Sequence, residues 1–265
     1  MVDIDLTLLD RGRVHADMNF VVDGHAVATA SNRDPDHEYA EFVVWSLVID
    51  HPEATVLWDT GSHPDAGHGH WHDGLYEAFA HVDADEHRLE DDLAAAGYDL
   101  DEVDAVVASH LHLDHAGGLA AFEGTDVPVY VHREELPYAY YSATTDEGSI
   151  AYHAPDFERE LNWEVVGGER RLLHEGVELL HLPGHTPGLL GGLIERDGGE
   201  DLLIAGDEAY VTANYEGQPM ATGLLWSNRD WRESLRRVRD VERRTGATVL
   251  LGHDLERFEA VRESL

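Results

Sequence analysis

The stretch His110-Leu111-His112-Leu113-Asp114-His115 places four side chains of the metal-ligating type within six residues. It directly follows the β-like run Val103–Ala108, so we expect it on the loop that leaves a buried strand. On an irregular turn, alternate and adjacent side chains can reach two neighbouring points. Histidine nitrogen and carboxylate oxygen suit zinc and related divalent ions, with bonds of roughly 2.0–2.2 Å. The stretch therefore predicts a divalent metal site, against the alternative of a chance cluster among the 19 histidines of the chain.

Three further ligand-type side chains occupy the same local setting, each following a β-like run and a glycine. They are His185 after the run Val177–Leu182, Asp207 after the run Leu202–Ala205, and His253 after the run Thr248–Leu251. Glycine lets the backbone turn sharply or approach a site closely. We therefore expect these loops to converge with the first one at one edge of a layered sheet.

The remaining periodicity predicts an α/β or layered α/β/α class, because strand and helix patterns alternate. Further β-like runs are Ile4–Leu9, Phe42–Ile49, Thr55–Trp58 and Val127–Val131, and helical patterns are Glu86–Ala96, Asp230–Arg244 and Leu255–Leu265. The segments Gly61–Asp85 and Ser142–Asp156 are rich in Gly, His, Asp and Ser, so we expect long surface loops there. The absence of repeats and linkers indicates one domain over residues 1–265.

Charge and composition exclude several classes of partner. The chain has 265 residues, 54 acidic side chains, 18 arginines and no lysine or cysteine, for a net charge of −36. Such a field repels nucleic acids and anionic membranes, and it favours a salt-rich cytoplasm in which the repulsion is screened. The apolar run Phe42–Ile49 is too short for a membrane span, and the first residues carry no signal-peptide pattern. We expect a cytoplasmic protein of halophilic origin.

The seven candidate ligands resemble the dinuclear pattern of the metallo-β-lactamase superfamily. Shorter segments, HLHLDHAGG at 110–118, PGHTPG at 183–188, DEAY at 207–210 and GHD at 252–254, are similar to the bacterial N-acyl homoserine lactonases, which act in quorum quenching. The similarity runs from about residue 40 to residue 258. It implies an αβ/βα four-layer sandwich with two metal ions between loops at one sheet edge.

The resemblance also implies a role for each site residue. The first metal ion is expected on His110, His112 and His185, the second on Asp114, His115 and His253, with Asp207 bridging both and Tyr210 and Asp114 acting in catalysis. Zinc is the first expectation, with cobalt, manganese or iron as alternatives. Tyr210 is expected to donate a hydrogen bond to the oxyanion, with a role in packing alone as the alternative. Asp59 is expected to orient a ligand imidazole, with a role as an ordinary acidic residue of a turn as the alternative.

The reaction that this resemblance implies is lactone opening by a metal-bridging hydroxide, with Asp114 passing the released proton to the leaving group. A thioester hydrolase like glyoxalase II is the alternative, although such enzymes usually add basic residues near the site. Nucleases of the RNase Z type need a basic surface, flavodiiron proteins tend to have Glu where His112 stands, and a metal-stabilised binding module would predict an incomplete ligand set. The expected partner is a small-molecule lactone, and the choice between monomer and homodimer stays open.

The loop after Asp59 differs from the lactonase pattern in its histidine content. We predict that Trp71, Leu75, Tyr76 and Phe79 line an apolar groove for an acyl chain. The repeat His68-x-His70-x-His72 fits either an extra metal site or a flexible polar lid, of which the lid is favoured.

Overall fold

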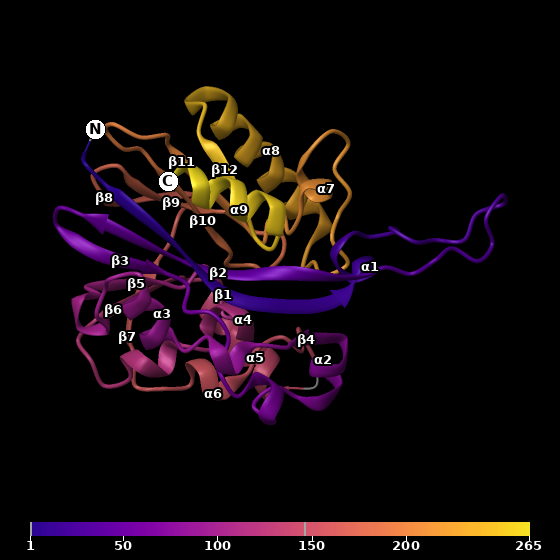
Figure 1. Cartoon of the computed structure of the whole chain (residues 1–265), viewed down its shortest axis with the longest axis horizontal. Helices are drawn as coiled ribbons and strands as arrows, with labels where there is room; N and C mark the ends of the chain where they lie inside the picture. Colours follow the sequence, from indigo (N-terminus) through magenta and orange to yellow (C-terminus); the bar gives the residue numbers. More distant parts are fainter. Residues whose placement is uncertain (1, 146) are drawn as a thin grey trace.

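The computed structural model describes residues 2–145 and 147–265, and within them the chain forms two facing β-sheets with helices on their outer faces (Figure 1). The first sheet has the strand order β4-β1-β2-β3-β5-β6-β7. Its strands are β1 (Asp5–Asp17), β2 (Tyr39–His51), β3 (Ala54–Trp58), β4 (Phe79–His81), β5 (Ala105–Val107), β6 (Pro128–His132) and β7 (Asn162–Val166). The part from β4 to β3 is antiparallel, and the part from β3 to β7 is parallel.

The second sheet has the order β12-β11-β10-β9-β8, and only its β11–β12 pair is parallel. Its strands are β8 (Arg170–His174), β9 (Val177–His181), β10 (Leu190–Ile194), β11 (Leu202–Gly206) and β12 (Thr248–Leu251). The α-helices are α1 (Met18–Val21), α2 (Asp73–Ala78), α3 (Leu89–Ala95), α4 (Leu113–Ala116), α5 (Glu135–Thr144), α6 (Ala154–Phe157), α7 (Thr212–Tyr215), α8 (Asn228–Thr245) and α9 (Leu255–Ser264). Short 3-10 turns are η1 (Ala66–His68), η2 (Ala84–Glu86), η3 (Leu100–Glu102) and η4 (Leu119–Phe122).

The core between the sheets draws side chains from both, such as Trp45 and Trp58 from the first and Leu179 and Ile204 from the second. Fully burying a side chain of this size contributes roughly 1.5–3 kcal/mol. Because residues from both ends of the chain enter this one cluster, we propose that residues 1–265 fold as a single domain.

Helix α8 shows how the outer layers form. Trp231, Leu235 and Val238 recur at helical spacing and are buried against the second sheet, while its arginines and carboxylates face outward. Ser227 caps the first turn by accepting from the Asp230 N–H at 3.3 Å. Gly246 ends the helix in the left-handed conformation, with φ 76°. Helices α3, α5 and α6 cover the opposite sheet (Figure 1), so the predicted αβ/βα sandwich is confirmed.

Several sequence-based boundaries are wrong in instructive ways. The predicted strand Ile4–Leu9 continues to Asp17, because β1 bulges between Asp10 and Arg13 and then pairs again with β2. The segments Gly61–Asp85 and Ser142–Asp156 are not plain surface loops. They hold α2, β4 and the ends of α5 and α6, and they bury Trp71 and Tyr152. In these segments burial depends on contacts far apart in the chain, which short-range patterning does not reveal.

In the described residues, no helix combines the length and apolarity that a membrane span requires.

Candidate metal centre and substrate pocket

The predicted ligands, although spread over more than half of the chain, converge at one edge of the two sheets. His110 and His112 lie on the loop after β5, Asp114 and His115 in α4, His185 on the loop between β9 and β10, Asp207 directly after β11, and His253 two residues after β12. The local sequence explains the first group. Leu111 and Leu113 are buried in apolar clusters, which fixes the turn that carries the histidines on either side.

The Asp207 carboxylate lies at the middle of this group. The Nε2 atoms of His110, His115, His185 and His253 lie 3.7, 3.5, 3.4 and 3.3 Å from its Oδ2. Asp207 itself is 2% exposed, so this carboxylate and the imidazoles around it are shielded from bulk water. One oxygen at such distances from four imidazoles is the arrangement that a bridging ligand requires.

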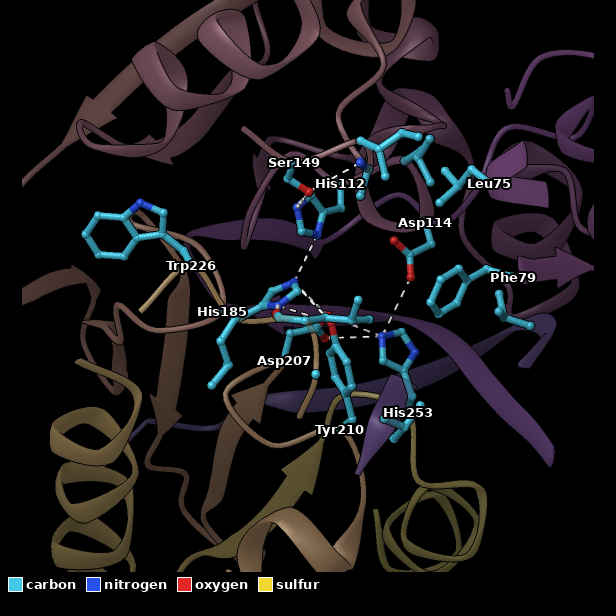
Figure 2. A pocket seen from close by; sticks show the side chains of 18 of the residues that line it. Leu75, Phe79, His112, Asp114, Ser149, His185, Asp207, Tyr210, Trp226 and His253 are labelled. Atoms are coloured by element: carbon cyan, nitrogen blue, oxygen red, sulfur yellow. Dashed lines mark hydrogen bonds and ion pairs between the residues drawn. The ribbon is translucent and has the colours of Figure 1, made fainter. Parts of the chain in front are cut away.

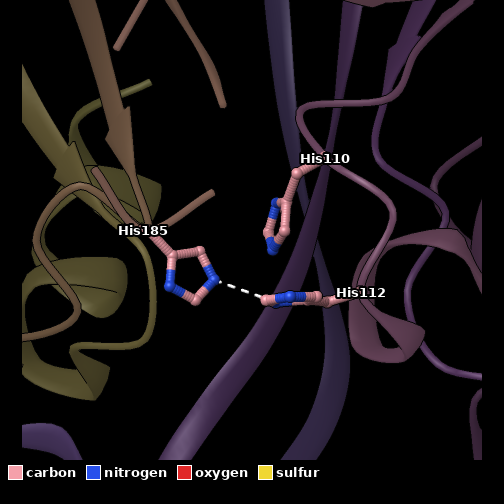
Figure 3. Close-up of side chains that lie close together, drawn as sticks. All are labelled: His110, His112 and His185. Atoms are coloured by element: carbon pink, nitrogen blue, oxygen red, sulfur yellow. Dashed lines mark hydrogen bonds between the residues drawn. The ribbon is translucent and has the colours of Figure 1, made fainter. Parts of the chain in front are cut away.

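The side chains divide into two clusters around Asp207. In the first, His110, His112 and His185 have ligand atoms within 4.8 Å of one another, and the rings of His110 and His185 meet nearly at right angles (Figure 3). His185 Nε2 lies 2.9 Å from His112 Nδ1. In the second, Asp114 Oδ2 lies 3.6 Å from the Nε2 atoms of both His115 and His253.

Three of the imidazoles are oriented through the nitrogen that points away from the centre. His115 Nδ1–H donates to Asp59 Oδ2 at 2.9 Å, as expected for an acid that orients a ring. His185 Nδ1–H donates to the Leu224 carbonyl at 2.7 Å, and His253 Nδ1–H donates to the Val43 carbonyl at 2.8 Å. Such bonds fix the tautomer that leaves Nε2 free as a ligand.

Asp59 has a left-handed backbone conformation, and its carboxylate accepts several hydrogen bonds. Its φ of 55° is left-handed, a conformation that Asp tolerates better than most residues. Its carboxylate also accepts the N–H and the hydroxyl of Ser109, both at 2.7 Å. Ser109 in turn contacts His110 Nδ1 at 3.0 Å, so Asp59 reaches the ligand loop at His110 as well as at His115.

The donor set fits divalent metal ions. In the described part of the chain, His110 Nε2, His115 Nε2 and Asp207 Oδ1 are buried without a hydrogen-bond partner. Leaving a buried polar atom unpaired costs about 1–3 kcal/mol, so three such atoms facing one another indicate a missing ligand. Histidine nitrogen with carboxylate oxygen is the chemistry of zinc and its neighbours in the first transition row.

Protonation follows the environment of each group. Burial, followed by the neighbouring imidazoles, lowers the pKa of His110 well below its ordinary value, which keeps that ring neutral and free to ligate. Burial opposes charging of His115, but the carboxylates of Asp114 and Asp207 outweigh it and raise its pKa. Burial also opposes ionisation of Asp207, yet His253 and His115 hold its pKa well below the ordinary range.

Tyr210 lies beside both clusters. Its hydroxyl is 3.1 Å from His185 Nδ1, and its ring packs edge-on between His185 and His253 at centroid distances of 5.3 and 5.1 Å. Burial, followed by the negative charges of Asp207 and Asp114, raises the pKa of Tyr210 well above its ordinary value. The phenol therefore keeps its proton and faces the pocket as a donor.

A mostly apolar pocket of about 370 Å³ opens onto the centre (Figure 2). Leu75 and Phe79 lie on the side of Asp114, and Trp226 lies on the side of His185. The predicted groove residues Trp71, Leu75 and Phe79 line it. Tyr76 was wrongly included, because its hydroxyl turns away to donate to the His81 carbonyl at 3.2 Å. Among the lining residues in the described chain none is an arginine.

Side-chain contacts hold part of the histidine-rich segment in place, and its predicted role as a flexible polar lid stays a prediction. His70 Nε2 lies 2.6 Å from Oδ1 of the buried Asp156, and its ring stacks on His63 at 3.7 Å. Stacked rings direct their lone pairs in parallel rather than toward one point. His68, by contrast, lies 3.9 Å from Asp85, away from His70, so the repeat does not form one cluster.

A further group, His51, Glu53 and His174, has ligand-type atoms within 4.8 Å of one another. Both ring nitrogens of His51 already have partners, since Nδ1 accepts from the Glu53 N–H at 3.1 Å and Nε2 donates to the Glu175 carbonyl at 3.0 Å. Glu53 reaches His174 Nδ1 at 3.2 Å. This group is held together without an ion.

Sequence reasoning missed the groups that position the ligands and one wall of the pocket. The carbonyls of Val43 and Leu224 carry no side-chain signal, so no pattern could have revealed them. Trp226 lies in a stretch without periodicity. Glu135 lies in the charged segment His132-Arg133-Glu134-Glu135, where a buried acid has no local signature.

Comparisons with known proteins show which family the sequence matches. The sequence model described as Metallo-beta-lactamase superfamily matches residues 39–253. The N-acyl homoserine lactonase AiiB of Agrobacterium fabrum is 30% identical over 268 residues, covering 98% of this chain and 96% of its own length. The N-acyl homoserine lactonase AiiA of Bacillus thuringiensis subsp. kurstaki is 29% identical over 230 residues, covering 83% of this chain and 84% of its own length.

Solved structures show the same similarity. An N-acyl homoserine lactone hydrolase with the product N-hexanoyl-L-homoserine bound at its catalytic metal center superposes with a TM-score of 0.77. It is 27% identical, and the match covers 98% of this chain and 96% of that one. The fold is therefore that of a known class of hydrolases.

Proposed function

The chain belongs to the metallo-beta-lactamase superfamily and is a hydrolase of that fold, and from this premise we propose that it opens the lactone ring of N-acyl homoserine lactones with two metal ions. The observation that carries the proposal is the convergence of seven ligand-type side chains, with the buried Asp207 carboxylate among them at the middle of the group. The proposed substrate class is supported by relatives at about 30% identity that are named as N-acyl homoserine lactonases.

The two clusters would each hold one ion, most readily zinc. His110, His112 and His185 would hold the first, Asp114, His115 and His253 the second, and Asp207 would bridge them. When bound, two such ions supply a water activated at neutral pH and Lewis-acid polarisation of the ester carbonyl.

The chain's own residues would do the remaining work of the reaction. The Tyr210 hydroxyl would donate to the carbonyl oxygen as negative charge develops there, because it is protonated and lines the pocket. Asp114 also lines the pocket, and its side chain is 21% exposed, so it is open to substrate. We propose that it takes up the released proton and delivers it to the leaving alkoxide.

The pocket favours a lactone with an acyl tail over a glutathione thioester. Its lining joins apolar side chains such as Phe79 and Trp226 to the metal centre, which suits a neutral head group and an aliphatic chain. Glutathione carries carboxylates that need cationic partners, and none of the described lining residues is an arginine, while the chain has no lysine. The glyoxalase II-like alternative lacks this support.

The decisive experiment is lactone hydrolysis by protein loaded with zinc at molar salt, followed by proton release with C4 to C12 acyl homoserine lactones. Asp207→Asn should remove transition-state and metal stabilisation worth several kcal/mol, about a hundredfold or more in rate. Asp240→Asn, on the exposed face of α8, is the matched control and should keep wild-type activity.

Lactone opening that depends on metal and collapses in Asp207→Asn alone would support the proposal. About two bound ions per chain without lactone opening would refute the proposed substrate and redirect the search to thioesters and other lactones.

We also propose that the protein works in a salt-rich cytoplasm, on the grounds of its net charge of −36.

A further inference from the structure

Glu135, the first residue of α5, has a carboxylate that is 0% exposed and accepts hydrogen bonds at both oxygens. Oε1 accepts the Leu111 N–H at 2.9 Å and the Tyr152 hydroxyl at 2.7 Å. Oε2 accepts the Thr186 hydroxyl at 2.7 Å and the Gly188 N–H at 3.2 Å. Burial raises the pKa of Glu135, and these four donors act against that rise by stabilising the charged form.

The donors belong to the two loops that carry the first cluster of candidate ligands. Leu111 stands between His110 and His112, on the loop after β5 of the first sheet. Thr186 follows His185 directly, on the loop between β9 and β10 of the second sheet. One carboxylate therefore joins the two sheets at the place where these three imidazoles meet.

Two further contacts show how closely the loops are held around Glu135. A Cβ added at Gly188 would lie 2.4 Å from the Glu135 Cβ, so only glycine permits this approach. Tyr152, which donates to Glu135, also packs its ring edge-on against His112 at 4.5 Å. The contact to Glu135 thus extends through Tyr152 to a ligand ring.

The second cluster is oriented by different groups. His115 is held by Asp59 and His253 by the Val43 carbonyl, and no hydrogen bond of Glu135 in the described chain reaches either ring. Asp59 contacts both clusters, His115 directly and His110 through Ser109. The hydrogen bonds of Glu135, by contrast, reach the loops beside the first cluster.

We propose that Glu135 is a positioning residue that sets the spacing of His110, His112 and His185. It would thereby set the affinity for the metal ion of the first cluster, and not for that of the second. This proposal rests on the metal assignment given above. Both carboxylate oxygens are required as acceptors, because each faces a backbone N–H that can only donate. A glutamine would turn its NH₂ group toward either Leu111 N–H or Gly188 N–H, neither of which can accept. At least one backbone bond between the loops would be lost.

The experiment compares Zn²⁺ binding by wild type, Glu135→Gln and the matched control Glu134→Gln, whose side chain is exposed next to it. Competition with a chromophoric chelator gives a dissociation constant for each ion. Loss of a group that orients ligands typically weakens metal binding about 10–100-fold. We expect that loss in one of the two constants for Glu135→Gln, and wild-type constants for Glu134→Gln.

The affected half is identified in two backgrounds. With His253→Ala, which leaves the first cluster intact, Glu135→Gln should still weaken Zn²⁺ binding about 10–100-fold. With His112→Ala, which leaves the second cluster intact, Glu135→Gln should have no effect. Should Glu135→Gln fail to fold, Thr186→Val and Tyr152→Phe each remove one donor and should weaken the same half to a smaller degree.

If Glu135→Gln weakened Zn²⁺ binding equally at both clusters, or at neither, the positioning role would be overturned and the proposed lactonase function would stand. A wild-type chain that takes up no Zn²⁺ would overturn the metal centre itself, and the proposed function with it. Because every readout is metal affinity, failure of the lactone substrate alone leaves this test unaffected.

Discussion

Replacing Tyr210 with phenylalanine should remove one hydroxyl and nothing else. The ring lies edge-on to both His185 and His253, at 5.3 and 5.1 Å, so a phenylalanine ring fills the same space. The hydroxyl's neighbour His185 Nδ1 keeps its bond to the Leu224 carbonyl, so the substitution leaves no new unpaired buried group at this nitrogen. We expect the free energy of unfolding to change by less than about 1 kcal/mol.

The expected kinetic effect is much larger. Tyr210 is 5% exposed, so a bond that it donates to a developing oxyanion is shielded from water. Removing one donor of this kind costs about 2–4 kcal/mol of transition-state stabilisation, which is about 30–1000-fold in kcat. KM should stay within about threefold, because the bond strengthens only as charge develops.

The assay is proton release with N-hexanoyl homoserine lactone, run beside metal content and thermal unfolding of the same preparations. Tyr215→Phe is the matched control, since Tyr215 is equally buried but donates to Glu242, outside the pocket. A Tyr210→Phe enzyme with two bound ions and kcat within threefold of wild type would refute the oxyanion role and favour a packing role. Loss of metal in the variant would instead assign Tyr210 to the stability of the centre.

Three further predictions concern the pocket, acid and salt. Phe79→Ala should lower kcat/KM for C10–C12 lactones by about 5–20-fold and for C4 by less than about twofold, because about one or two methylenes lose burial at ~0.8 kcal/mol each; equal losses at both lengths would contradict it. Burial and the stacked His181 lower the pKa of His132 to about 4, below the ~6.5 expected in the unfolded chain. The unfolded chain therefore binds a proton before the folded one does, so the stability that the neutral His132 supports is complete above pH 6.5 and is lost as the pH falls toward 4. The melting temperature of His132→Asn should therefore fall less than that of wild type between about pH 6.5 and about pH 4. Parallel curves of melting temperature against pH would show that titration of His132 does not contribute. Finally, the melting temperature should rise between dilute buffer and molar KCl, since the Debye length falls from about 10 Å at 0.1 M to about 3 Å at 1 M; a flat or falling curve would remove the halophilic interpretation.

The sequence was informative where a local pattern marked a strand and the next residues were of a type that can ligate metal. Strand β12 was predicted with its observed bounds, because an apolar run ended by glycine leaves little choice of boundary. The candidate ligands were found because their residue types are restricted and each follows a strand. Their convergence was inferred from placement alone, and the structure brings all seven together. Their roles toward metal remain a prediction.

Non-local features escaped for physical reasons. Strand β10 (Leu190–Ile194) contains two glycines, which have low strand propensity, and it forms because β9 and β11 pair with it on both sides. Strand β8 is half exposed and rich in arginine, so its pattern resembles a surface turn. Trp71 does lie on a loop, between η1 and α2, but no local signal shows that its side chain is only 2% exposed.

The acidic composition and the carboxylates of the site have different physical roles. Asp59 and Glu135 are buried, and each accepts hydrogen bonds from a backbone N–H and from side-chain donors, so their charges are compensated where they stand. The net charge of −36 must therefore reside largely on exposed side chains, where molar salt screens it. Buried pairs are screened much less. We therefore propose that the acidic composition reflects the solvent in which the protein works, whereas Asp59 and Glu135 serve the candidate site. Spacing in the sequence singled out Asp59, but it gave no sign of the buried Glu135.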